Sequence, residues 1–198
     1  INENAFYGCS ALRSISIPES VTSIGTSAFS GCKSLNAITI GKSVKSIGSH
    51  AFDNCIKLTS LTLSTVDFIN DYNLCHIFGT QITRCELIDE VKIIKPNLFM
   101  SCLNLETVVI GENVTTIGAH AFEGCKSLKS INIPNSVTDI GAYAFKNCSS
   151  LNNVSIPISV TTIGAAAFAN CVSLESIHIP NKVTKINASM FDGCSSLT

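Results

Sequence analysis

The sequence predicts a repeat solenoid, in which similar short units stack into an elongated body and each unit contacts only its neighbours. Cysteine recurs every 23 residues in two runs that are separated by an interruption. The same frame of apolar, proline and glycine positions surrounds these cysteines, most clearly over residues 131–151. A fixed period of roughly 20–50 residues is typical of such stacks. The repeating cysteines are Cys9, Cys32, Cys55, Cys102, Cys125, Cys148, Cys171 and Cys194.

Each unit begins with a short strand. In the unit that starts at Leu128, Ile131 and Ile133 alternate with the polar Asn132, which predicts a strand with one buried face. Pro134 follows; because proline has no N–H to donate, it ends the strand and starts a turn. Prolines at the same place in sister units are Pro18, Pro157 and Pro180.

A bend or second short strand comes next. Val137 and Ile140 are three residues apart and are expected to point inward. Gly141 closes this segment, and we expect glycine here because it reaches backbone conformations that strain other residues. The sister glycines are Gly25, Gly48, Gly118 and Gly164.

The last part of each unit has helical spacing. Ala144, Phe145, Cys148 and Leu151 fit one or two helical turns, with Phe145 as the largest core side chain. Glycine or asparagine precedes the repeating cysteines, and both tolerate the left-handed conformation that ends a helix. These residues are Gly8, Gly31, Asn54, Gly124, Asn147, Asn170 and Gly193. The predicted unit is therefore strand, turn, strand, turn, helix.

The eight repeating cysteines share one phase, which predicts an inward-facing column of buried free thiols. A small, soft apolar residue suits such a crowded place. The alternative is that stacked neighbours approach disulfide range. No two cysteines have the C-x-x-C spacing, so a zinc site is not expected.

The frame approximates L-x-x-I-x-I-P-x-x-V-T-x-I-G-x-x-A-F-x-x-C, and it resembles the BspA-like leucine-rich repeats. This resemblance implies a curved, right-handed α/β solenoid with a parallel sheet on the concave face and short helices or turns on the convex side. We expect a single domain over residues 1–198, with about eight to nine repeats, as a fragment of a longer protein. Close matches begin at Leu12, Leu35, Leu105, Leu128, Leu151 and Leu174.

The resemblance also implies a function. Such arrays are found in surface proteins of oral and gut bacteria and of parasitic protists, where they adhere to extracellular matrix or host cell-surface proteins. The expected location is thus the cell surface or the extracellular space, with the cytoplasm as the alternative. A structural spacer and an intracellular interaction scaffold are the competing functions, and free thiols favour the scaffold.

Composition narrows the choice further. Charged residues make up 14% of the chain and the formal net charge is −1, so a basic face for nucleic acid is not expected. No apolar run approaches the roughly 18 residues of a membrane span, so this segment should not insert into a membrane. No catalytic, cofactor or metal motif appears, and we predict neither an enzyme nor a bound cofactor. The oligomeric state is left open.

The pattern breaks over residues 64–100. Val66 and Ile69 come one position early, and Lys95-Pro96 replaces the glycine corner. One hypothesis is a loop or kink that presents Phe68, Asp71, Tyr72 and Arg84 to a partner. The other is a degenerate repeat that still stacks. In this repeat, Leu74 or Cys75 is expected in the phenylalanine place and Phe78 near the cysteine place.

The outward face of the first strands is the second candidate surface. It is small, polar and nearly uncharged, and it could contact an extended protein surface; the alternative is that serine and threonine are merely soluble strand formers. Aromatic anchors are absent from it, so we expect weak affinity that is raised by multiple copies. Its candidate binding residues are Thr62, Arg84, Glu86, Thr107, Asn132, Asn153 and His178.

Overall fold

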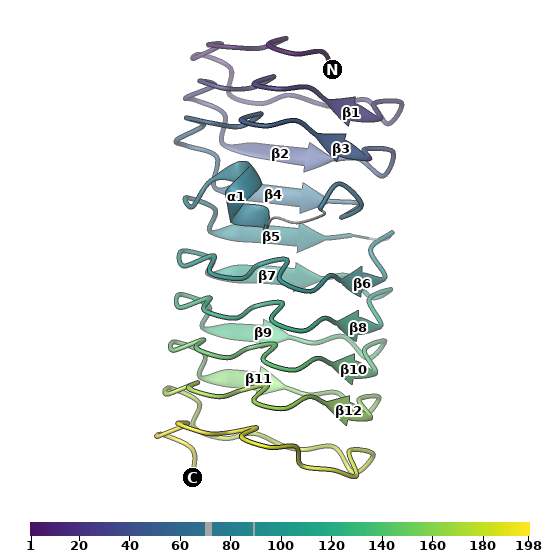
Figure 1. Ribbon diagram of the computed structural model, residues 1–198, viewed down its shortest axis with the longest axis vertical. Helices are drawn as coiled ribbons and strands as arrows, with labels where there is room; N and C mark the ends of the chain where they lie inside the picture. Colours follow the sequence, from purple (N-terminus) through teal and green to yellow (C-terminus); the bar gives the residue numbers. More distant parts are fainter. Residues whose placement is uncertain (70–72, 89) are drawn as a thin grey trace.

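The computed structural model describes residues 1–69, 73–88 and 90–198. Successive turns of the chain stack along one axis, and the two ends of the chain lie at opposite ends of the stack (Figure 1). All paired strands are parallel. The predicted solenoid with a parallel sheet is therefore confirmed.

The first strands of the repeats build one face of the stack. They are β2 (Ala37–Ile40), β4 (Ser60–Leu63), β5 (Arg84–Leu87), β7 (Thr107–Ile110), β9 (Ser130–Asn132) and β11 (Asn153–Ser155). The first four pair in the order β2-β4-β5-β7, and β9 pairs with β11 next to β7. Ile38 and Ile40 are buried while Ala37 and Thr39 are exposed, as the predicted alternation requires.

The predicted second strand is also present, but it is only two residues long. These strands are β1 (Ser23–Ile24), β3 (Ser46–Ile47), β6 (Ile93–Ile94), β8 (Thr116–Ile117), β10 (Asp139–Ile140) and β12 (Thr162–Ile163). They form two separate sheets, β1-β3 and β6-β8-β10-β12. Residues 64–69 and 73–83, which the structure describes, form no strand, so the rows of two-residue strands are interrupted between β3 and β6.

The repeating glycines, such as Gly141, follow the two-residue strands as predicted. The physical reason for glycine at this position is different from the one predicted. Gly141 does not adopt a positive φ. A Cβ atom on Gly141 would instead lie 2.5 Å from the backbone nitrogen of Ala119 in the preceding repeat. Glycine is required at this corner because successive backbones approach each other too closely for any side chain.

The segments that carry the repeating phenylalanine and cysteine are turns, which the expected short helices or turns allow, but the helix expected in every unit is not formed among the described regular repeats. Tyr143 and Asn147 both have left-handed backbones, with φ of 58° and 60°. The N–H groups of Tyr143, Phe145 and Asn147 donate to carbonyls of the following repeat at 2.7–2.9 Å. An α-helix would use these N–H groups within the segment, whereas here the neighbouring repeat satisfies them.

The predicted left-handed conformation of the residue before each repeating cysteine is confirmed. Ser101, which precedes Cys102 and is neither glycine nor asparagine, also adopts it, with φ of 58°. Among the described residues, α1 (Leu74–Phe78) in the irregular repeat is the one α-helix. Asn73 caps its first turn by accepting the backbone N–H of His76.

A column of stacked phenylalanine rings forms the centre of the core. Phe145 lies between Phe122 and Phe168, with ring centroids 5.1 and 5.2 Å away and nearly parallel planes. In the irregular repeat Phe78 occupies this column, 4.7 Å from Phe52. The expectation that Leu74 or Cys75 takes the phenylalanine place is wrong, because α1 carries Phe78 into the stack.

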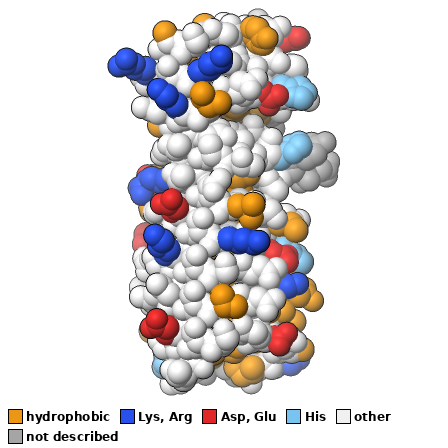
Figure 2. Space-filling view, turned by 90° about the vertical axis from the view of Figure 1, so that its left-hand side faces the viewer, with side chains coloured by type: hydrophobic (Ala, Val, Ile, Leu, Met, Phe, Trp, Pro, Cys, Tyr) orange, Lys and Arg blue, Asp and Glu red, His pale blue; other side chains and the backbone are white. Residues whose placement is uncertain are grey.

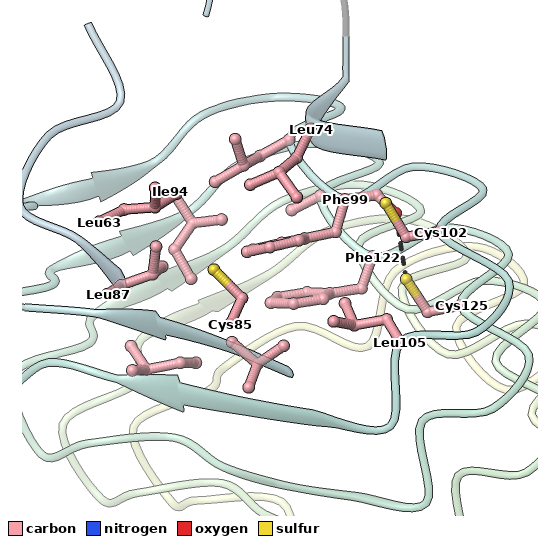
Figure 3. Close-up of a cluster of buried hydrophobic side chains, with 14 of the residues drawn as sticks. Leu63, Leu74, Cys85, Leu87, Ile94, Phe99, Cys102, Leu105, Phe122 and Cys125 are labelled. Carbon is pink, nitrogen blue, oxygen red and sulfur yellow. Dashed lines mark hydrogen bonds between the residues drawn. The ribbon is translucent and has the colours of Figure 1, made fainter. Parts of the chain in front are cut away.

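The cysteine thiols are hydrogen-bonded within the core. The Cys125 thiol donates to the Phe99 carbonyl oxygen at 3.1 Å (Figure 3). Burial raises the pKa of the Cys125 thiol to about 12, so its thiolate is scarce near neutral pH. The column of buried free thiols is thus confirmed for most repeats, whereas Cys9 is exposed. The same contact to the preceding repeat is made by Cys32, Cys55, Cys148, Cys171 and Cys194.

Cys102 is the exception to the free-thiol prediction. It forms a disulfide with Cys75 of α1, and the two Cα atoms are 5.7 Å apart. The irregular repeat places Cys75 beside Cys102, which regular stacking would not do. The disulfide therefore joins α1 covalently to the next repeat.

Thiol counting tests this assignment. Alkylation of the denatured, unreduced chain is expected to modify eight cysteines, and all ten after reduction. Peptide mass mapping should find Cys75 and Cys102 as the protected pair. Ten modified cysteines without reduction would contradict the disulfide.

Candidate protein-binding surfaces

The face built by the first strands (β2, β4, β5, β7, β9 and β11), called the first sheet from here on, brings four of the predicted site residues together. Thr62 lies directly opposite Glu86, and Arg84 lies directly opposite Thr107. The Arg84 Nη2 atom is 3.8 Å from Glu86 Oε2, and both side chains remain partly exposed. An exposed ion pair of this kind contributes little to stability, so both side chains are available for contact.

The other candidates on this face lie further along the stack. Asn132 and Asn153 are exposed on β9 and β11, beyond β7, on which Val109 is also exposed. His178 is exposed but lies outside the strands. The face thus offers hydroxyl and amide groups along its length and one pair of opposite charges near the irregular repeat.

Phe68 does not present its ring to a partner. It is only 5% exposed, and its ring packs edge-on against Phe78 with centroids 6.2 Å apart. The shifted register turns this side chain into the core, so its assignment as a binding residue is wrong. Asp71 and Tyr72 lie outside the described residues.

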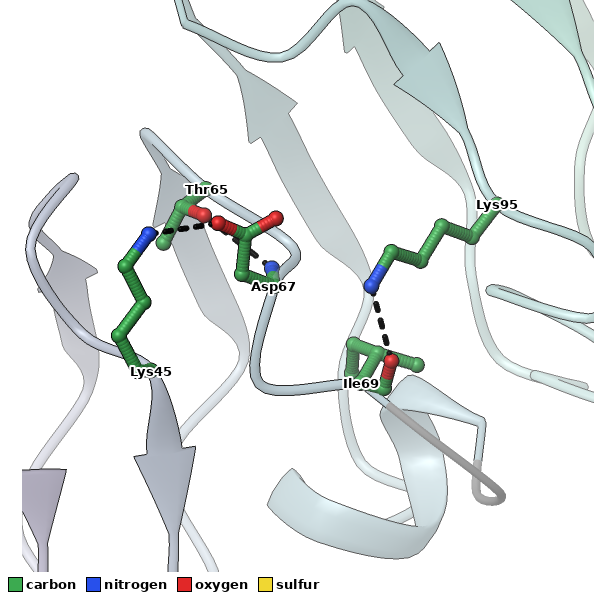
Figure 4. A network of polar contacts seen from close by, with 5 residues as sticks. All are labelled: Lys45, Thr65, Asp67, Ile69 and Lys95. Carbon is green, nitrogen blue, oxygen red and sulfur yellow. Dashed lines mark hydrogen bonds and ion pairs between the residues drawn. The ribbon is translucent and has the colours of Figure 1, made fainter.

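A polar network outside the predicted sites holds the irregular loop, whose described part here is residues 64–69. The Lys45 Nζ atom lies 2.7 Å from Asp67 Oδ2, and Lys95 Nζ donates to the Ile69 carbonyl oxygen at 3.0 Å (Figure 4). The hydrogen bond from Lys45 holds the pKa of the Asp67 carboxyl below its usual value. Asp67 N–H also donates to Thr65 Oγ1 at 3.1 Å. Lys95 occupies the position that is glycine in the regular repeats, such as Gly118. This replacement is the sequence feature that could have indicated the network.

A hollow of about 430 Å³ opens beside this loop. It lies where the short-strand sheet is interrupted, between β3 and β6. Its lining includes Lys42, Lys45, Lys92 and Lys95 together with Asp67 and Glu90. By contrast, the face in Figure 2 shows charged side chains of both signs scattered over a largely uncharged surface.

The model of the BspA type leucine rich repeat region matches six copies, over residues 1–129 and 76–198. The chain belongs to the BspA type leucine-rich repeat family. Leucine-rich repeats generally serve as non-enzymatic modules for protein interaction, through the extended surface that stacking creates. No curated protein sequence matches the chain significantly.

A solved structure of a bacterial leucine-rich repeat protein shares this fold. A leucine-rich repeat protein from Bacteroides ovatus is 24% identical to this chain and superposes with a TM-score of 0.59. The match covers 99% of this chain and 62% of the Bacteroides chain. A leucine-rich cell surface protein from Faecalibacterium prausnitzii is 26% identical with a TM-score of 0.49, covering 100% of this chain and 69% of its own. This BspA type chain thus spans less than two thirds of the Bacteroides protein's length.

A metal-binding cluster and a membrane-spanning helix are both absent from the described residues of this BspA type chain. These residues contain no cluster of three or more histidine, cysteine or acidic side chains that could hold a metal ion. Across the same residues, no helix has both the length and the apolar character needed to cross a membrane.

Proposed function

We propose that this chain is a protein-binding or adhesion module of a cell-surface protein, and that it binds host or matrix proteins through the first sheet. The observation that carries the proposal is the continuity of this sheet through the irregular repeat. β5 keeps its register with β4 and β7, although the same repeat leaves a break in the short-strand sheet. The outward side chains of β4, β5 and β7 therefore stay aligned across the irregular repeat.

The dimensions of the face favour weak binding at a single site. Six strands about 4.8 Å apart and about four residues long present on the order of 300 Å². A standard interface buries about 800 Å² on each partner. Several copies on a surface, acting together, would raise the overall affinity.

The disulfide supports a location outside the cytoplasm. Bonds such as that between Cys75 and Cys102 persist mainly in oxidising compartments. This favours the surface module over the intracellular scaffold.

Binding of the chain to a panel of immobilised extracellular matrix proteins tests the proposal. Arg84→Glu is expected to weaken binding about tenfold, because it reverses the charge and repels Glu86 in the middle of the face. Lys126→Glu is the matched control, since Lys126 is exposed and lies outside this sheet.

Equal losses for the two variants would argue against the sheet face. If the wild-type chain bound no protein of the panel, the structural spacer would be the better function.

A further inference from the structure

The hollow beside the irregular repeat lies where the rows of two-residue strands are interrupted, between β3 and β6. β3 pairs only with β1 and β6 only with β8, so each of these strands leaves one edge facing the interruption. Two steps of a parallel sheet separate them by about 10 Å. This width admits one extended chain, whereas a helix with its side chains needs about 10–12 Å to itself.

The described part of the irregular loop next to this space, residues 64–69, turns its apolar side chains into the core. Val66, Phe68 and Ile69 are buried, and the Ile69 N–H donates to the Val66 carbonyl oxygen at 3.0 Å to form a turn. Lys95 shows that the backbones are spread apart here, because the equivalent Gly118 and Gly141 have no room for a Cβ atom. The hollow is lined by residues of this loop and by residues before β3 and around β6.

The charge of the lining is opposite to that of the whole chain. Its four lysines exceed Asp67 and Glu90 by two formal charges, while the chain carries −1. Lys45 and Lys95 hold the loop from its two sides. Lys92 is exposed, and its amine makes no ion pair or hydrogen bond with the described residues. Lys92 is therefore available to a carboxylate.

An apolar side chain lies among these lysines. Ile93 is 50% exposed on β6 and lines the hollow. The equivalent positions on neighbouring strands are polar, as at Ser46, Thr116 and Asp139. Ile93 thus gives the hollow an exposed apolar contact in a row that is otherwise polar.

We infer that this hollow binds an extended, acidic segment of a protein partner, with an apolar side chain on Ile93 and a carboxylate on Lys92. Charge complementarity selects an acidic peptide, and the one-strand width selects an extended one. This contact is separate from the first sheet, because none of the sheet-face candidates lines the hollow.

Fluorescence anisotropy with a short fluorescein-labelled peptide of alternating glutamate and leucine tests the inference. The wild-type chain is expected to bind it, and to bind more weakly as salt is raised. The same peptide with lysine in place of glutamate should not bind. Lys92→Glu is expected to weaken binding about tenfold, whereas Lys126→Glu, the same change outside the hollow, should leave it unchanged.

Two further variants locate the peptide. Ile93→Ser should weaken binding but preserve its dependence on salt, because it removes an apolar contact only. Arg84→Glu on the first sheet should have no effect. The inference is overturned if the wild-type chain does not bind the acidic peptide, if Lys92→Glu and Lys126→Glu weaken binding equally, or if only Arg84→Glu does so. Unchanged melting temperatures for these exposed substitutions would show that the variants remain folded.

Discussion

Phe145→Ala is expected to lower the free energy of unfolding by about 3–5 kcal/mol. The Phe145 side chain is fully buried and its ring is stacked on both sides. Truncation leaves a cavity in the middle of the aromatic column, and the flanking repeats cannot collapse without losing their backbone hydrogen bonds to each other. Thermal or urea unfolding, followed by far-ultraviolet circular dichroism, measures the loss.

The matched control is Tyr7→Ala, because the Tyr7 side chain is 64% exposed. We expect the control to change the free energy of unfolding by less than about 0.5 kcal/mol. Because each repeat depends on its neighbours, a defect at Phe145 should also spread to the adjacent units. An unchanged melting temperature for Phe145→Ala would show that the column does not hold the stack together.

Gly141→Ala is expected to destabilise the fold by about 1–3 kcal/mol, although it adds only one methyl group. The new Cβ atom would meet the nitrogen and Cα of Ala119 at 2.5 and 2.8 Å. Both are backbone atoms of the preceding repeat, so no side-chain rotation can relieve the clash. The stack would have to open locally, which lengthens the β8–β10 hydrogen bonds.

Gly41→Ala is the control for this prediction. The nearest atom to its added Cβ is the Cα of Glu19, at 4.0 Å, so the methyl group has room. Replacement of glycine where the backbone allows it usually stabilises by about 0.4–1 kcal/mol, through the unfolded chain. Similar unfolding midpoints for the two variants would mean that close stacking does not explain the glycine corner.

The irregular repeat determines where this solenoid differs along its length. It preserves the first sheet, replaces the convex turn by α1, and opens the short-strand sheet. The Cys75–Cys102 disulfide and the lysines on either side of the loop secure this rearrangement. Both proposed contacts depend on the irregular repeat. Binding through the first sheet depends on the strand pairing that this repeat preserves, and peptide binding depends on the hollow beside it.

The sequence by itself was sufficient for the repeat, the parallel sheet and the inward phases. In a stack, each residue lies beside its copy one period away, so Ile131 and Val154 must share a row once the 23-residue period is recognised. The outward rows follow from the same rule, which is why Arg84, Glu86 and Thr107 could be placed on one face.

The tertiary structure alone decided the convex turns, the cause of the glycine corner and the packing of the irregular repeat. The spacing of Ala144, Phe145 and Cys148 suits a helix or a turn equally well, and the choice depends on carbonyls of the following repeat. The burial of Phe68, the disulfide and the hollow likewise depend on neighbouring repeats. The local sequence indicates which side chains turn inward. The hydrogen-bond partners of the backbone groups lie in neighbouring repeats, and the positions of these partners determine the backbone conformation of each turn.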